Sequence, residues 1–147
     1  MSVGRICVRE VDLVDAGEFV WQAAARMQSR AVGTLVVLNE SQEPIGLITD
    51  RDLVERVMAK QRNPNDTLVS DVMTTPPKVI HEDASIESAL SLMRSGRFRR
   101  LPVVDDNRKL VGLVSLDDVL MLLAEEFKDI GQLLERETPQ AVAETVS

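Results

Sequence analysis

Two hydroxyl–acid pairs, 66 residues apart, are the residues of this sequence best suited to chemistry. Thr49 is followed three positions later by Asp52, and Ser115 is followed in the same way by Asp118. A glycine and two aliphatic residues precede each hydroxyl, and an amphipathic segment follows it. Each pair is therefore expected at a point where a strand leads into a helix.

Two roles fit such a pair. A Ser or Thr followed three residues later by an acid is the sequence of a helix N-terminal capping box, in which both side chains bind backbone N–H groups. The same groups can also bind a nucleoside phosphate. A helix N-terminus and a hydroxyl attract phosphate oxygens, and a carboxylate one turn further on can accept hydrogen bonds from ribose. The two roles are compatible in one structure, and the sequence leaves both open.

The elements that position the two pairs are repeated without a gap. The same shift of 66 residues aligns Ala23 with Ala89 and Met27 with Met93. Two copies of one supersecondary unit usually pack around a pseudo-two-fold axis, so a pocket at their junction is built twice.

The first repeat is expected to contain two helices and a β-hairpin. Hydrophobic periodicity predicts helices over 18–30 and 50–60, and short apolar runs predict paired strands over 34–38 and 45–48. In the second repeat the corresponding elements are a strand over 76–80, a helix over 85–95, and paired strands over 100–104 and 110–114.

A longer helix is predicted from 116 to about 136. Its apolar stripe continues well beyond the length needed to cover its own repeat, so we expect it to cover a second molecule as well. The residues of the stripe are Val119, Leu123, Phe127, Ile130 and Leu134. The polar sequence from Thr138 onward is typical of a frayed tail.

Size and composition fit two small units that form one domain. The 147 residues are 44% hydrophobic, with few aromatic residues, so the core must consist of Val, Leu, Ile, Ala and Met. Each half alone, at about 60 residues, would be marginally stable. The predicted organisation is a first repeat at 1–60, a linker at 61–71, a second repeat at 72–127, and a C-terminal extension and tail at 128–147.

Several classes of protein are disfavoured. The longest apolar run, 119–124, is six residues, whereas a bilayer span needs roughly 20, and no signal peptide is visible. The single cysteine fits a cytoplasmic location. Of the net charge of −7, residues 117–147 contribute −6, with eight acids against two bases. Nucleic-acid binding is therefore not expected, since it needs clustered positive charge.

Metal binding and catalysis also lack the necessary residues. One cysteine, Cys7, and one histidine, His81, cannot assemble a soft-ligand metal site within a chain. The sequence contains no nucleophile-elbow motif and no glycine-rich phosphate loop. We do not expect an enzyme, and no required cofactor is predicted.

The motifs together resemble a known family. The segments GLITDRD (46–52) and GLVSLDD (112–118), with VMT (72–74) and RRLPVVD (99–105), are similar to the paired cystathionine β-synthase (CBS) domain, or Bateman module. The resemblance covers about residues 3–127. It implies an α/β fold of two β-α-β-β-α repeats related by pseudo-two-fold symmetry, here with an extended C-terminal helix. It also implies two clefts that commonly bind AMP, ADP, ATP or, in some members, S-adenosylmethionine.

The resemblance assigns roles to both pairs. Thr49 and Ser115 would contact phosphate, while Asp52 and Asp118 would contact ribose.

It also places a basic pair, Arg99 and Arg100, near the phosphates. Their counterparts in the first repeat, Gly33 and Thr34, carry no charge, so the two clefts are expected to differ in affinity. Arg51, near the start of a predicted helix, is a further candidate phosphate ligand. The alternative is that the arginines between 94 and 100 form a solvated basic edge.

The resemblance also implies contacts to the base from the second strand of each unit. In the second repeat these residues are Pro77, Val79 and Ile80, and in the first repeat the neighbourhood of Val14 corresponds to them. The first repeat lacks the Met-Thr-x-Pro phrase of the second, which leaves the base contacts of its cleft open.

Two hypotheses of different classes follow. In the first, the chain is a regulatory module that senses an adenosine nucleotide and reports it to an unidentified protein. In the second, it is an interaction scaffold with empty clefts, assembled through the long C-terminal helix. A homodimer is expected in either case, and a nucleic-acid binder ranks third.

Overall fold

The computed structural model describes residues 1–96 and 98–137, and the tail predicted from Thr138 lies outside them. The first half contains two β-strands and several short helices. In chain order these are α1 (Val3–Ile6), α2 (Val20–Arg30), β1 (Thr34–Leu38), β2 (Pro44–Thr49), α3 (Asp50–Leu53), the π-helical turn η1 (Val54–Met58) and α4 (Val69–Val72). The second half contains β3 (Ile80–His81), α5 (Ile86–Gly96), β4 (Arg100–Val104), β5 (Leu110–Ser115) and α6 (Leu116–Glu137).

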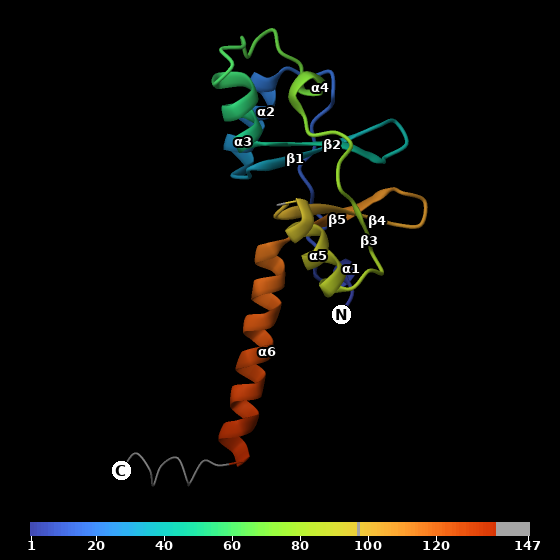
Figure 1. The fold of residues 1–147 in the computed structure, drawn as a ribbon, viewed down its shortest axis with the longest axis vertical. Helices are drawn as coiled ribbons and strands as arrows, with labels where there is room; N and C mark the ends of the chain where they lie inside the picture. The colour runs from blue at the N-terminus through green and yellow to red at the C-terminus, as the bar shows by residue number, and fades with distance from the viewer. Residues whose placement is uncertain (97, 138–147) are drawn as a thin grey trace, which may run out of the picture.

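The two predicted hairpins are confirmed and have equivalent registers. Thr34 of β1 lies opposite Thr49 of β2, and Arg100 of β4 lies opposite Ser115 of β5. The hairpins lie one above the other, with their turns on the same side (Figure 1). The Leu110 N–H, at the start of β5, donates to the Gln42 carbonyl in the turn of the first hairpin at 3.0 Å.

The predicted opening strands are largely absent. Of the segment 76–80, only Ile80 lies in a strand, the two-residue β3, which pairs in parallel with β4. Pro76 and Pro77 have no N–H to donate to a ladder, which disfavours a strand at the beginning of this segment. In the first repeat, the neighbourhood of Val14 contributes a single parallel bridge, between Leu13 and Val36. The predicted helix at 50–60 is α-helical only to Leu53 and continues as η1.

Each hydrophobic core is completed by a helix from elsewhere in the chain. Val3 of α1, near the N-terminus, is fully buried in the core formed by the second repeat. Val69 and Val72 of α4, which follow the first repeat, are buried in the core of that repeat. The spatial units therefore differ from two consecutive stretches of sequence, and the two repeats are linked through their cores.

The chain crosses a hairpin edge immediately after each of these short helices. Val8 and Leu113 of β5 exchange two backbone hydrogen bonds, both of 2.9 Å. Thr74 and Leu47 of β2 exchange another two, of 2.8 and 3.1 Å. The strand residue before each crossing is glycine in both repeats. A Cβ at Gly112 would collide with the backbone of the crossing segment, whereas a Cβ at Gly46 would meet the side chain of Met73.

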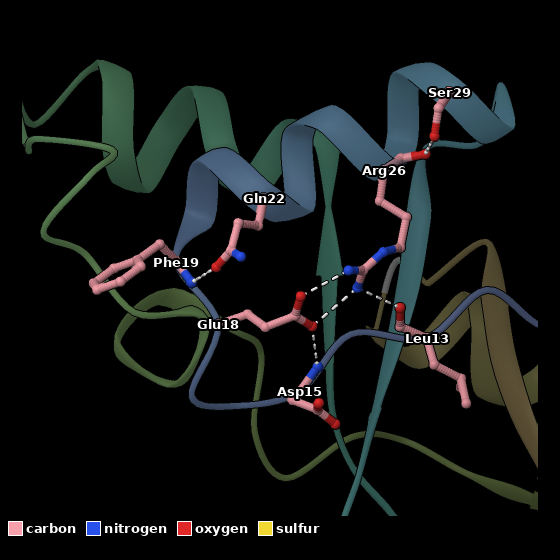
Figure 2. A network of polar contacts seen from close by, with 7 residues as sticks. All are labelled: Leu13, Asp15, Glu18, Phe19, Gln22, Arg26 and Ser29. Carbon is pink, nitrogen blue, oxygen red and sulfur yellow. Dashed lines mark hydrogen bonds and ion pairs between the residues drawn. The ribbon is translucent and has the colours of Figure 1, made fainter.

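The segment before α2 is anchored by a polar network (Figure 2). The guanidinium of Arg26 donates to both carboxylate oxygens of Glu18, at 2.7 and 2.9 Å, and to the Leu13 carbonyl at 2.9 Å. Glu18 also accepts from the Asp15 N–H at 2.8 Å. The hydrogen bonds from Arg26 lower the pKa of Glu18 below its usual value. The network fixes the backbone of residues 13–18 against α2.

Helix α6 extends well beyond the rest of the molecule (Figure 1). Val119 is 1% exposed, whereas Phe127 is 72% exposed and Ile130 is 52% exposed. Only the beginning of α6 thus packs against its own chain. Within the described part of the chain, no helix combines the length and apolar character needed to cross a membrane.

The two motif glycines provide a matched test of the crossings. A Cβ at Gly112 would lie 2.7 Å from the Val8 carbonyl oxygen, a backbone atom, whereas a Cβ at Gly46 would meet the flexible side chain of Met73. We expect Gly112→Ala to lower the free energy of unfolding by about 1–3 kcal/mol and Gly46→Ala to lower it by less, because Met73 can move. Urea unfolding measures both. Equal losses would show that backbone proximity is not the deciding factor.

The Glu18 network predicts a pH-dependent contribution to stability. Glu18 has a lower pKa in the folded protein than in the unfolded chain, so its contribution is complete above its usual pKa of 4.5 and is lost as the pH falls through the folded value. At pH 7 we expect Glu18→Gln to cost about 1 kcal/mol, with the difference from wild type shrinking in acid. The control is Glu55→Gln, at an exposed ion pair with Arg51. Urea unfolding between pH 3 and 7 that showed a constant difference would contradict this assignment.

Candidate ligand clefts

Both hydroxyl–acid pairs form reciprocal capping boxes. The Asp52 N–H donates to Thr49 Oγ1 at 3.1 Å, and the Thr49 N–H donates to Asp52 Oδ2 at 3.0 Å. The corresponding distances for Ser115 and Asp118 are 3.1 and 2.8 Å. The capping interpretation is thus confirmed in both repeats.

Capping leaves binding capacity in both pairs. A hydroxyl that accepts one hydrogen bond can still donate its own proton. Each carboxylate uses Oδ2 for the cap, which leaves Oδ1 able to accept from another group. Oδ1 of Asp52 lies 3.7 Å from the guanidinium of Arg56. That distance exceeds the usual range for a direct N–H···O hydrogen bond. Each pair therefore presents a donor and an acceptor while holding its helix.

The first pair lies in a hollow between the two repeats, which we call cleft 1. Its volume is about 390 Å³. Cleft 1 brings together five of the predicted site residues, Thr49, Arg51, Asp52, Arg99 and Arg100. Its other lining residues are Thr34, Leu47, Asp50, Thr74, Lys78, Gly96 and Phe98.

The second pair lies in a smaller hollow, cleft 2, of about 270 Å³. It brings together Ser115, Asp118 and Arg100. The other lining residues are Val8, Glu10, Val11, Asp12, Ala31, Val32, Gly33, Thr34 and Leu113.

The two clefts are built from equivalent positions. The shift of 66 residues relates Leu47 and Thr74 in cleft 1 to Leu113 and Val8 in cleft 2. The same shift relates Lys78 to Asp12, and neither residue was predicted as part of the site. They follow the edge crossings at Thr74 and Val8, and extending the repeat register back to residue 8 is the sequence signal that would have found them.

Thr34 and Arg100 line both clefts and are counterparts of each other. Thr34 is 6% exposed. Its Oγ1 is the one buried side-chain polar atom without a hydrogen-bond partner within residues 1–96 and 98–137. A buried hydroxyl without a partner is unfavourable by about 1–3 kcal/mol.

The predicted base-contacting residues lie elsewhere. Pro77 and Val79 line a separate hollow of about 210 Å³ with Pro44 and Val104. Ile80 is 5% exposed and belongs to the core of the second repeat. The structure does not bring these three residues together with either hydroxyl–acid pair. The apolar side chains around cleft 1 are Leu47 and Phe98 instead.

Two of the cleft 1 arginines have acidic neighbours. Arg51 donates to Glu55 at 2.8 Å, and this hydrogen bond raises the pKa of the arginine. Arg99 lies 4.0 Å from Asp117. Both side chains are more than two-thirds exposed, at 82% and 71%. Such exposed pairs are weak, so either arginine can turn to an anion in the cleft.

Neither Cys7 nor His81 lines cleft 1 or cleft 2. Burial raises the pKa of the Cys7 thiol, which keeps the thiol protonated near neutral pH. His81 Nε2 lies 2.6 Å from Asp106 Oδ1, in the turn between β4 and β5. Within the part of the chain that the structure describes, no group of three or more His, Cys, Asp or Glu side chains could hold a metal ion.

Comparison with known proteins supports the repeat architecture. An uncharacterised protein of Methanopyrus kandleri is 38% identical over 122 residues, which is 83% of this chain and 62% of that protein. The chain thus spans less than two-thirds of the length of this relative. A proposed signal-transduction protein with CBS domains from Burkholderia ambifaria has a similar structure, with a TM-score of 0.77 and 28% identity over 84% of this chain and 93% of that one.

A second solved structure, CBSX2 in complex with AMP, has a TM-score of 0.72 and 26% identity, and covers 84% of this chain and 96% of that one. The protein of that name comes from Arabidopsis thaliana. The CBS domain profile matches residues 3–59 and 69–125, which are the two repeats with their short leading helices. The chain belongs to the CBS domain family and is a tandem CBS pair.

Proposed function

We propose that this CBS pair is a regulatory module that binds an adenosine nucleotide such as AMP in cleft 1. The observation that carries the proposal is the composition of that cleft. A hydroxyl and a carboxylate from the first repeat, Thr49 and Asp52, face cations that come mainly from the second. A nucleotide presents the complementary groups, which are phosphate oxygens and ribose hydroxyls.

The chemistry divides among a few residues. Lys78, Arg99 and Arg100 offer charged donors to a phosphate, and charge-assisted hydrogen bonds of this type are the strong ones. Asp52 Oδ1 accepts from ribose. Leu47 and Phe98 provide apolar surface for the base. A volume of about 390 Å³ lies within the range of small-molecule sites, about 300–1,000 Å³. The AMP complex of CBSX2 supports the same ligand class.

The regulatory role follows from the fact that the residues around the ligand come from both repeats. Thr49 and Asp52 belong to the first repeat, whereas Lys78 and Arg100 belong to the second. A ligand that holds both sets favours the arrangement in which they are close, and so shifts the population of repeat orientations. A partner protein that contacts both repeats would detect that shift. No required cofactor enters this mechanism, and the ligand acts as the signal.

A second candidate function is assembly through α6. Leu120, Leu123, Phe127 and Ile130 recur at spacings of three, four and three residues, and each is at least 39% exposed. This is the a/d pattern of a coiled-coil seam. The helix has 22 residues and is about 33 Å long. We propose that a second copy of the chain covers this seam in a symmetric homodimer, because identical stripes complement each other around a two-fold axis.

AMP binding to the full chain tests the sensor proposal. Isothermal titration should show binding that weakens at least tenfold in Asp52→Asn, because the amide replaces one carboxylate acceptor with a donor. Glu87→Gln, a charge-neutralising change at an exposed residue that does not line cleft 1, is the matched control and should bind as wild type. Circular dichroism checks that each variant is folded. A folded wild-type protein that binds no AMP would leave the assembly function as the better account.

Sedimentation equilibrium tests the role of α6. We expect Phe127→Glu to convert a dimer to a monomer, because it places a charge in the apolar seam. Gln132→Glu adds the same charge on the opposite face of the helix and should remain dimeric. The AMP affinity of both variants should match wild type if cleft 1 acts independently of assembly. A dimer that survives Phe127→Glu would place the interface elsewhere.

A further inference from the structure

The two clefts have the same architecture but opposite charge. Among residues 1–96 and 98–137, cleft 1 has four cationic side chains against two carboxylates, those of Asp50 and Asp52. Among the same residues, cleft 2 has one cationic side chain, Arg100, against three carboxylates. Ser115 also lines an adjoining hollow with Arg99, Arg100 and Asp117, so the two hollows together place two arginines against four carboxylates. The cations of cleft 1 are Arg51, Lys78, Arg99 and Arg100, and the acids of cleft 2 are Glu10, Asp12 and Asp118.

The difference in charge arises because equivalent positions in the two repeats carry different side chains. Lys78 of cleft 1 corresponds to Asp12 of cleft 2, so a cation on one wall becomes a carboxylate on the other. Arg99 corresponds to Gly33, which has no side chain to offer. The hydroxyl–acid pairs themselves are kept, since Thr49 and Asp52 correspond to Ser115 and Asp118. The ribose-binding acceptor is therefore present twice, whereas the surplus of phosphate-binding cations is present once.

The carboxylate of Asp12 is held in place on its wall. The backbone carbonyl of Asp12 accepts a hydrogen bond from the Val36 N–H at 3.0 Å, and its carboxylate accepts one from Arg30 at 2.7 Å. Arg30 offsets part of the charge of Asp12, but it is not among the lining residues of cleft 2. Around Ser115, the carboxylates of Glu10, Asp117 and Asp118 still outnumber Arg99 and Arg100, so cleft 2 and the hollow beside it offer a phosphate no surplus of positive charge.

The volumes of the two clefts agree with a nucleotide in cleft 1 and a ligand without phosphate in cleft 2. Cleft 2 measures about 270 Å³ and cleft 1 about 390 Å³. A nucleoside without phosphate is both smaller and free of negative charge, so it fits the smaller and more acidic hollow better than a nucleotide does.

We propose that the clefts bind different ligands, with a nucleotide in cleft 1 and a phosphate-free adenosine derivative, neutral or positively charged, in cleft 2. Asp118 holds the ribose in cleft 2, and Asp12 and Glu10 exclude phosphate and attract a cationic 5′ substituent. The proposal rests on the proposed function, because it assumes that both hydroxyl–acid pairs bind nucleosides. The module then responds to two ligands of one chemical family.

The test uses the full chain and three probes, AMP, neutral adenosine, and S-adenosylmethionine, which carries a net positive charge. Isothermal titration should give one AMP per chain, unaffected by Asp118→Asn. In saturating AMP, adenosine or S-adenosylmethionine should still bind one further site, and Asp118→Asn should weaken that binding at least tenfold. Asp12→Lys should raise the AMP stoichiometry from one to two, and the reverse change, Lys78→Asp, should weaken AMP binding in cleft 1 at least tenfold.

Asp12→Asn is the matched control for Asp12→Lys, because it also removes the ion pair with Arg30 but adds no cation; AMP should stay at one per chain. Two AMP per wild-type chain, or one AMP in a folded Asp12→Lys variant, would overturn the division of ligands and leave the nucleotide-sensing function standing. Failure of both phosphate-free probes to bind in saturating AMP would overturn it as well. Absence of AMP binding with S-adenosylmethionine bound through Asp118 would instead refute the proposed function and retain the assignment of cleft 2.

Discussion

The structure depends on the two backbone crossings that tie each repeat to a segment outside it. The hydrogen bonds of Val8 with Leu113 and of Thr74 with Leu47 add an extra segment to the edge of each hairpin. The crossings follow directly from the burial of α1 and α4 in the two cores, and the crossing at Val8 requires glycine at position 112 of the adjacent strand. They also deliver the next few residues, which include Asp12 and Lys78, to the walls of the clefts. Packing of the cores thus determines which side chains can meet a ligand.

Local signals were sufficient to predict the hairpins and the long helix. The apolar runs at 34–38 and 100–104 agree with β1 and β4, because each is bounded by polar residues or turns and pairs with its sequence neighbour. The short helices α1 and α4 were missed, since four residues are too few to show a helical period and their burial depends on distant parts of the chain. The hydrophobic pattern also could not distinguish the π-helical turn η1 from ordinary α-helix.

The candidate site was predictable where the repeat is strong. Thr49, Asp52, Ser115 and Asp118 lie where the capping pattern placed them, because a capping box is a local structure. The walls that face them were missed, since Asp12 and Lys78 lie in segments without regular structure, outside the stretch where the repeats match most clearly. Only the repeat register, extended back to residue 8, relates the two positions. Pro77, Val79 and Ile80 were named by family resemblance, and the structure places them outside both clefts.

Fold and specificity reside in different residues of this molecule. The capping boxes hold the first turns of α3 and α6, and the motif glycines allow the crossings. Changing any of them alters the framework of a cleft. Lys78 and Arg99 are exposed, so their charges can change at little cost to folding. A duplicated unit can therefore keep one geometry for ribose in both clefts while the charge around it diverges, and this divergence is what separates cleft 1 from cleft 2.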